Sequence, residues 1–303
     1  MALAQRDIEH RYYGIKKDLR TLLDSTLTGT ATTTNSEKSA IICNNDDGLP
    51  SLFWVNAGEY DYSLDGAAMA RLFQRIQEIL DKWLLEGGPS HLWFGQFVAE
   101  EYRRGTKFVH ASLSKQSEEY STRTVLTDLL FSPEYQRRIG IAYAQSYSEW
   151  KSLSSAAAGD LANVLSDAVA RGINPTETAH IISDRLDVSM SKAFNIAQTE
   201  QVGAYRKAIW DETEDTQTRL GMRTALLWLS ALKATTRSWH ASRHGFTYSV
   251  EDVKAFYGRA GNRYHCYCGQ TPILIDMYGN PYNTALFDRL ASERKEWQEA
   301  EAA

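Results

Sequence analysis

Apolar residues recur at helical spacing through most of the first 212 residues of this 303-residue chain. In the segment 5–24, for example, one stripe contains Ile8, Tyr12, Ile15, Leu19 and Leu22. A period of this kind predicts amphipathic helices that pack through their apolar faces. After about residue 222 glycines interrupt the sequence and short apolar runs replace the stripes. The expected fold is therefore mainly α, with a helical N-terminal and central region and a small C-terminal α+β module.

The same patterns divide the chain into six predicted segments. They are an N-terminal helix (1–24), a flexible arm (25–50), a helical region (51–158), a helical unit (159–212), an α+β module containing His and Cys residues (222–285) and a terminal helix (286–303). The arm is predicted to lack regular secondary structure, because its Thr-rich stretch has no apolar period and little to bury.

The unit 159–212 is expected to contain three helices joined by tight turns. The first covers about 159–171 and follows a separate helix over about 133–152. The second begins at Pro175, behind the N-cap residue Asn174, and a third begins at Asp187 or Ser189. Short helices of this kind, packed against one another, would form a compact helical core.

Composition narrows the class of protein. The net charge is −5, whereas a protein that coats DNA non-specifically should be basic. Local basic clusters at 103–107 and 137–138 are interpreted as solvated helix faces. The sequence contains no run of about 18 apolar residues, so no transmembrane helix is predicted, and the first residues do not resemble a signal peptide. The cysteines, Cys43, Cys266 and Cys268, are few and odd in number, which argues against a secreted disulfide framework.

Four side chains of the C-terminal module have the spacing of metal ligands. Cys266 and Cys268 are two residues apart, so on an extended segment both sulfurs face the same way. His240 and His244 are one helical turn apart. Because zinc accepts thiolates and neutral imidazoles in a tetrahedral shell, these four residues are a candidate zinc site. The alternative is a pair of buried thiols and hydrogen-bonded histidines that hold the module together without a metal.

The sequence contains no complete set of catalytic residues. Glu200 lies within an apolar helix face, where a carboxylate must be paired, and Arg237 is the candidate partner. A catalytic Glu200 is the sharper alternative, but no nucleophile or second acid is evident near it. His244, Asn262 and His265 match a His-Asn-His nuclease finger poorly, and the common phosphate-loop, hydrolase and zincin signatures are missing. The chain is therefore expected not to be an enzyme.

A set of short motifs runs in a fixed order through the second half of the chain. They are Ile-Ala-Gln-Thr-Glu at 196–200, Thr-Arg-Ser-Trp-His at 236–240, Gly245, and Cys-Tyr-Cys at 266–268. In this order and spacing they resemble the Mu F-like minor head proteins of tailed phages, over about residues 130–270. Two positions depart from the family pattern: Lys233 stands where the family usually has Asp, and Tyr267 where it usually has Arg.

The resemblance implies a minor head protein inside a tailed-phage capsid, docked on the portal, with a role in head assembly, DNA packaging or DNA delivery. The implied partners are the portal protein, with the major capsid or scaffolding protein and packaged DNA as further candidates, and no membrane. The implied location is the interior of the virion head, after a stage in the host cytoplasm. The alternative is a zinc-dependent DNA-binding or nucleic-acid-processing factor delivered with the phage genome. Residues 1–130, rich in Trp and Tyr, are the expected docking surface, because aromatic residues dominate interface energetics.

Overall fold

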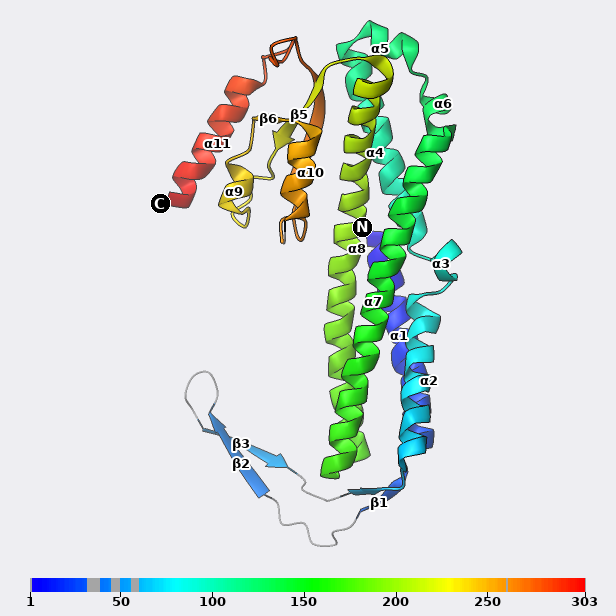
Figure 1. Ribbon diagram of the computed structural model, residues 1–303. Helices are drawn as coiled ribbons and strands as arrows, with labels where there is room; N and C mark the ends of the chain where they lie inside the picture. The colour runs from blue at the N-terminus through cyan, green and yellow to red at the C-terminus, as the bar shows by residue number, and fades with distance from the viewer. Residues whose placement is uncertain (1, 32–38, 45–49, 56–59, 260, 303) are drawn as a thin grey trace. The chain divides into compact units, whose positions relative to one another are not determined.

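The computed structural model describes residues 2–31, 39–44, 50–55, 60–259 and 261–302. The chain forms two compact units, each built from segments that are far apart in the sequence. Unit 1 contains Leu92–Tyr147 and Asn195–Ala303, and unit 2 contains Ala2–His91 and Ser148–Phe194. Helices dominate the described residues (Figure 1), which confirms the prediction of a mainly α protein with a small C-terminal α+β module.

Unit 2 contains the N-terminal helix α1 (Ala2–Thr26) and α2 (Gly66–Leu84), which pack against each other. The predicted stripe of α1 is buried, from Ile8 at 0% exposed to Leu22 at 4%. Asp65 begins α2 by accepting a hydrogen bond from the backbone of Ala68 at 2.6 Å, which satisfies one of the free amides of the first turn. The short helix α3 (Gly88–His91) follows α2. The apolar stripe of α1 thus explains which of its faces is buried, and the cap at Asp65 explains where α2 begins.

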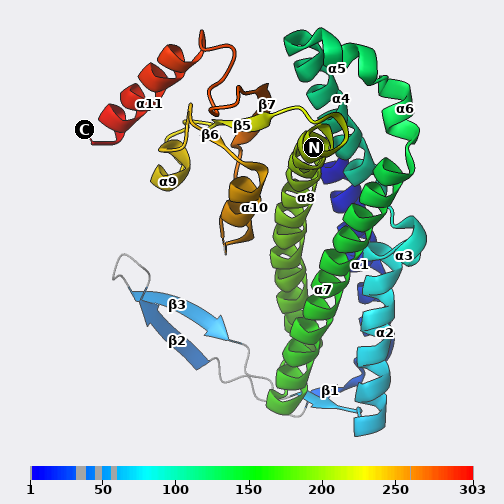
Figure 2. The same ribbon diagram turned by 45° about the horizontal axis from the view of Figure 1, so that its top comes forward.

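Two long helices replace the four shorter ones that the sequence predicted over 133–212. They are α7 (Pro133–Arg171) and α8 (Pro175–Leu220), which lie side by side in both views (Figures 1 and 2). The turn between them is as predicted: Gly172 has a φ of 64°, and the Asn174 side chain caps the amide of Thr176 at 2.8 Å. No helix of the described residues is both long and apolar enough to cross a membrane.

The predicted helix start near Ser189 was wrong for a tertiary reason. Serine is a good N-cap because its hydroxyl can bond to a nearby backbone amide. Here the Ser189 hydroxyl instead bonds to the hydroxyl of Tyr12 at 2.7 Å, in the buried interior of unit 2. With its polar group satisfied by a residue from α1, Ser189 stays inside the helix. The interval at 152–158 likewise remains helical, since it contains neither proline nor glycine.

The segment 25–50 contains regular structure, contrary to the prediction of an unstructured arm. Strand β1 (Gly29–Ala31) pairs antiparallel with β4 (Tyr60–Tyr62), and β2 (Ser39–Asn44) pairs with β3 (Pro50–Val55) as a hairpin seen in Figure 2. Residues 32–38 and 45–49 lie outside the described part of the chain. Threonine and isoleucine are β-branched and suit strands, but no apolar period revealed the partners. Whether the segment is mobile stays a prediction.

Unit 1 combines helices with a three-stranded antiparallel sheet. The helices are α4 (Gly95–Gln116), α5 (Glu118–Arg123), α6 (Leu126–Phe131), parts of α7 and α8, α9 (Ser238–Ala241), α10 (Val250–Gly258) and α11 (Phe287–Ala302). The strands are β5 (Thr224–Leu229), β6 (Thr247–Tyr248) and β7 (Gly269–Leu274), in the order β6–β5–β7. Strand β5, formed by one of the short apolar runs after residue 222, is therefore the central one, and Figure 2 shows α9 and α10 beside this sheet.

The centre of unit 1 is an aromatic core around β5. Trp228 is fully buried and stacks on Tyr257 of α10, with ring centroids 5.4 Å apart. Helix α4 covers the edge strand β7: the amide side chain of Gln116 donates to the carbonyl of Pro272 and accepts from the amide of Leu274, both at 3.0 Å. Gln116 thus satisfies backbone groups of an edge strand that would otherwise be left unpaired.

Candidate metal centre

Three of the four predicted ligands come together at one buried point of unit 1. His240 lies on α9, and Cys266 and Cys268 lie directly before β7. The Nδ1 atom of His240 is 3.4 Å from the sulfur of Cys266 and 3.8 Å from that of Cys268. All three ligand atoms lie within 4.8 Å of one another. The residues are only 1%, 6% and 3% exposed, so the cluster belongs to the core of the module.

The spacing of these atoms fits a tetrahedral metal ion. With Zn–S about 2.3 Å and Zn–N about 2.05 Å, the edge between a nitrogen and a sulfur of a tetrahedral zinc shell is about 3.6 Å. The two observed separations, 3.4 and 3.8 Å, lie on either side of that value. The donor types also suit zinc, which prefers thiolate and imidazole. The cluster could therefore hold a metal ion without a change in the backbone.

Hydrogen bonds around the sulfurs favour a thiolate. The Cys266 thiol has its pKa lowered to about 3, first by the hydrogen bond from Cys268 and then by His240 and Arg206, although burial opposes this. The same hydrogen bond, with burial, raises the pKa of Cys268. The hydrogen bond between the two sulfurs thus favours a thiolate at Cys266 and a thiol at Cys268, and a bound cation would displace the remaining proton. Ser230 and Tyr257 add polar contacts to the sulfurs at 3.3 and 3.6 Å.

Arg206, on α8, holds the cysteine segment in place. Its guanidinium donates to the carbonyl of Cys266 at 2.6 Å and twice to the carbonyl of Cys268, at 3.0 and 2.8 Å. The guanidinium also lies 4.5 Å from the centroid of the Tyr257 ring, and the residue is only 2% exposed. Sequence reasoning missed this residue. The available signal was one arginine in helical register with the buried Ile209 and Thr213, where a charge needs a dedicated partner.

His244 is placed outside the cluster. Its Nδ1 accepts a hydrogen bond from the backbone amide of Ser230 at 2.9 Å, and its Nε2 lies 3.0 Å from a carboxylate oxygen of Glu293 on α11. An accepting Nδ1 puts the proton of the neutral ring on Nε2, so both nitrogens are used. His244 therefore links β5 to α11, and the predicted four-residue shell is reduced to three protein donors.

The close packing of α11 beside His244 requires a glycine at position 245. Its φ is 79°, and a Cβ at this position would lie 2.9 Å from the Cβ of Leu290 on α11. Both the left-handed backbone and the close helix exclude a side chain. The backbone of Gly245 also donates to the carbonyl of Trp228 at 2.9 Å. The glycine of the motif is therefore explained by packing of α11 on the module.

The remaining residues singled out in the sequence have structural partners. Arg237 donates to the carbonyl of Tyr264 at 2.8 Å, so it does not form the expected bridge to Glu200. Glu200 is half-buried and lines a pocket of about 270 Å³. Asn262 accepts from Trp239 at 3.0 Å and donates to the carbonyl of Phe256 at 2.9 Å, which occupies both ends of its amide. Asn262 thus holds a hydrogen-bonded turn and does not have the role of the asparagine in a nuclease finger.

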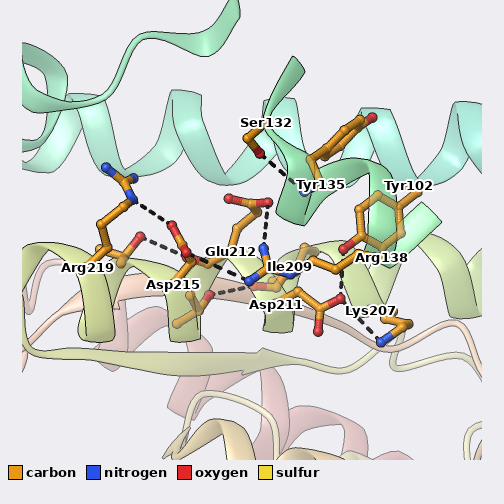
Figure 3. A network of polar contacts seen from close by, with 12 residues as sticks. Tyr102, Ser132, Tyr135, Arg138, Lys207, Ile209, Asp211, Glu212, Asp215 and Arg219 are labelled. Carbon is orange, nitrogen blue, oxygen red and sulfur yellow. Dashed lines mark hydrogen bonds and ion pairs between the residues drawn. The ribbon is translucent and has the colours of Figure 1, made fainter. Parts of the chain in front are cut away.

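A second buried polar cluster lies where α4, α7 and α8 meet in unit 1 (Figure 3). Glu212 is 2% exposed and lies 3.4 Å from Arg138, which also approaches Asp215 at 3.8 Å. Tyr102 donates to Asp211 at 2.7 Å. Burial raises the pKa of Glu212 to about 7, despite the nearby Arg138. Arg138, expected to lie on a solvated face, is instead a partner of buried carboxylates.

The fold and the site define a class of protein. It contains long helices and a small α+β module with a buried cluster of His and Cys. Residues 159–271 match the family model described as Phage Mu protein F like protein. This part of the chain, from the end of α7 through α8 to β7, is therefore similar to the Mu F-like family, and the match supports a phage head-related protein. No curated protein and no solved structure matches the chain.

The two positions that depart from the family pattern contact each other. The ammonium of Lys233 lies 4.1 Å from the centroid of the Tyr267 ring. A cation above an aromatic face is attracted by the negative face of the ring. The contact between Lys233 and Tyr267 therefore joins the loop before α9 to the segment that carries the cysteines.

Proposed function

We propose that this chain is a minor head protein of a tailed phage, located inside the capsid and docked on the portal. Its role lies in head assembly, DNA packaging or DNA delivery. The observation that carries the proposal is the match of residues 159–271 to Phage Mu protein F like proteins. The net charge of −5 favours docking on protein over broad binding to DNA, since non-specific DNA binding depends on neutralising phosphates. The major capsid and scaffolding proteins are further partners, and no enzymatic turnover is required.

The exposed apolar side chains favour the C-terminal part of unit 1 as the docking surface. Most of the exposed large apolar side chains among the described residues fall within 239–286. Met277 is 67% exposed, Tyr278 80% and Tyr282 73%. Exposed aromatics concentrated in one part of the chain favour an interaction site there, because the residues that carry most of the binding energy of an interface are enriched in Trp and Tyr. Residues 1–130 were the expected surface, but outside the interval 32–59, whose side chains are not described, the large apolar side chains exposed there are Leu3, Tyr13 and Val125.

The test is a pull-down of purified portal protein by the full chain at low and high salt. The chain should retain the portal at high salt, and the triple variant Met277→Ser, Tyr278→Ser, Tyr282→Ser should bind at least ten-fold more weakly. The matched control is Leu3→Ser with Tyr13→Ser, which removes exposed apolar groups from α1 and should bind normally. No binding by the full chain contradicts portal docking. Loss only in the control places the surface on α1 and contradicts the C-terminal assignment.

We also propose that His240, Cys266 and Cys268 bind zinc as a structural element of the module. The nitrogen–sulfur separations of 3.4 and 3.8 Å support this, as does the anchoring of the cysteine carbonyls by Arg206. Metal analysis of the purified chain should give one zinc per molecule, and Cys266→Ser should abolish it. A metal-free wild-type protein contradicts the zinc proposal but not portal docking. Metal-dependent cleavage of DNA would instead favour a nucleic-acid-processing factor delivered with the genome.

A further inference from the structure

We infer that the metal centre keeps one coordination position open and that this position takes a carboxylate from outside the chain. The inference rests on the proposed zinc site and names the ligand that completes it. Within the described residues, the cluster brings together three donors, His240, Cys266 and Cys268. A tetrahedral zinc ion with three protein ligands retains a fourth position for an exchangeable ligand. His244 does not fill it, because both of its ring nitrogens are engaged elsewhere.

A pocket leads to the three donors. Its volume is about 180 Å³, and its lining includes all three donor residues together with Lys233, Thr236 and Arg237. A water molecule occupies about 30 Å³ in the liquid, so the pocket has room for a carboxylate group beside the ion. The fourth position can therefore be reached from solvent, although the donor residues themselves are buried.

The charge of the pocket selects an anion. A divalent ion with two thiolates carries no net charge, so an entering carboxylate would make the centre negative. Positive side chains nearby would then stabilise the bound carboxylate. Lys233 and Arg237 line the pocket, and its described lining contains no Asp or Glu to oppose an anion. Both cations are held in place: the Lys233 ammonium lies over the Tyr267 ring, and Arg237 donates to the carbonyl of Tyr264. Cations that are already positioned bind an anion with a smaller loss of conformational entropy.

A carboxylate fits these features better than a neutral ligand. Its oxygen is a ligand that zinc accepts at about 2.0–2.2 Å, and its second oxygen remains free to accept hydrogen bonds from Lys233 or Arg237. The same chemistry is available from a small free carboxylate and from an Asp or Glu side chain of a partner protein. The acidic side chain would link the metal centre to assembly, whereas a free carboxylate would only complete the shell.

The test uses the full chain loaded with Co²⁺, whose visible absorption reports its ligands. Acetate should shift the spectrum saturably. The double variant Lys233→Gln, Arg237→Gln should still bind one equivalent of Co²⁺ but require at least five-fold more acetate for half of the shift. Lys192→Gln, an exposed lysine of unit 2, combined with Arg185→Gln is the charge-matched control and should respond like wild type. Lys233→Asp should place a carboxylate in the pocket and remove the response to acetate.

The outcomes separate the two proposals. If no Co²⁺ binds, the metal site itself is refuted. If Co²⁺ binds but acetate causes no change, the open position is refuted. A response that appears only in His265→Ala also refutes it, because His265 lines the pocket and would then be the fourth ligand. A glutamate-containing peptide and its glutamine counterpart separate the two sources. If the glutamate peptide shifts the spectrum and the glutamine peptide does not, the ligand is a partner's side chain. If acetate shifts the spectrum and neither peptide does, the ligand is a free carboxylate.

Discussion

Glu212 should make the protein less stable as the pH rises from about 4.5 to about 7. The ordinary pKa of this carboxyl is 4.5, and burial raises it to about 7 in the folded protein. Below about pH 4.5 the group is protonated in both states, so it contributes no difference. Between the two values the unfolded chain releases the proton while the folded protein keeps it, and the free energy of unfolding falls as pH rises. At about 1.4 kcal/mol per pH unit, the full loss above pH 7 is about 3 kcal/mol.

The substitution Glu212→Gln should remove this pH dependence. Glutamine is neutral at every pH, has nearly the same volume, and its side-chain oxygen can still accept from Arg138, which lies 3.4 Å away in the wild type (Figure 3). We expect the variant to be as stable as wild type near pH 4.5 and more stable by about 1–3 kcal/mol at pH 8. Urea unfolding at a series of pH values, followed by circular dichroism, measures both.

The control for this prediction is Glu119→Gln, which alters a carboxyl that is 62% exposed on α5 and paired with Arg123. It should leave the pH profile unchanged, because exposed ion pairs contribute little. The reasoning would be refuted if Glu212→Gln kept the wild-type slope between pH 4.5 and 7, or if it were less stable than wild type at pH 8. Either result would mean that the ionised carboxylate and Arg138 stabilise the folded state more than burial opposes it.

Substitutions at Arg206, Gly245 and Ser189 test three other parts of the structure by urea unfolding, and the first also by zinc affinity. Arg206→Lys keeps the charge but loses the fork that binds both cysteine carbonyls, so it should cost about 2–4 kcal/mol and lower the affinity for zinc; an unchanged affinity would contradict the anchoring role. Gly245→Ala should cost more than about 1 kcal/mol because of its φ of 79° and the nearby α11, whereas Gly159→Ala, exposed inside α7 with open space at its Cβ, should stabilise by about 0.5–1 kcal/mol. Ser189→Ala should cost about 1–3 kcal/mol by leaving the Tyr12 hydroxyl unpaired, and adding Tyr12→Phe should recover most of the loss; a purely additive double variant would count against the bond.

Local patterns in the sequence were enough to predict most of the elements. The stripe of α1, the cap at Asn174 and the turn at Gly172 all depend on residues within a few positions of one another, which periodicity and capping rules describe. Part of the predicted set of metal ligands also comes together in the structure, as His240, Cys266 and Cys268. Two cysteines two residues apart share a face on an extended segment, so the spacing alone predicts that the sulfurs of Cys266 and Cys268 lie close together.

Tertiary contacts decided the rest, because they join residues whose separation in sequence carries no pattern. Ser189 stays inside α8 since its hydroxyl meets Tyr12, 177 residues away. His244 leaves the metal cluster because Glu293 of α11 and the amide of Ser230 occupy its two nitrogens. Arg206 enters the site through carbonyls about 60 residues further along the chain. The sequence by itself determined a helical scaffold, a small α+β module and a set of candidate metal ligands. Only the folded structure decided which of those side chains converge, because hydrogen-bonding partners from distant elements compete for each one.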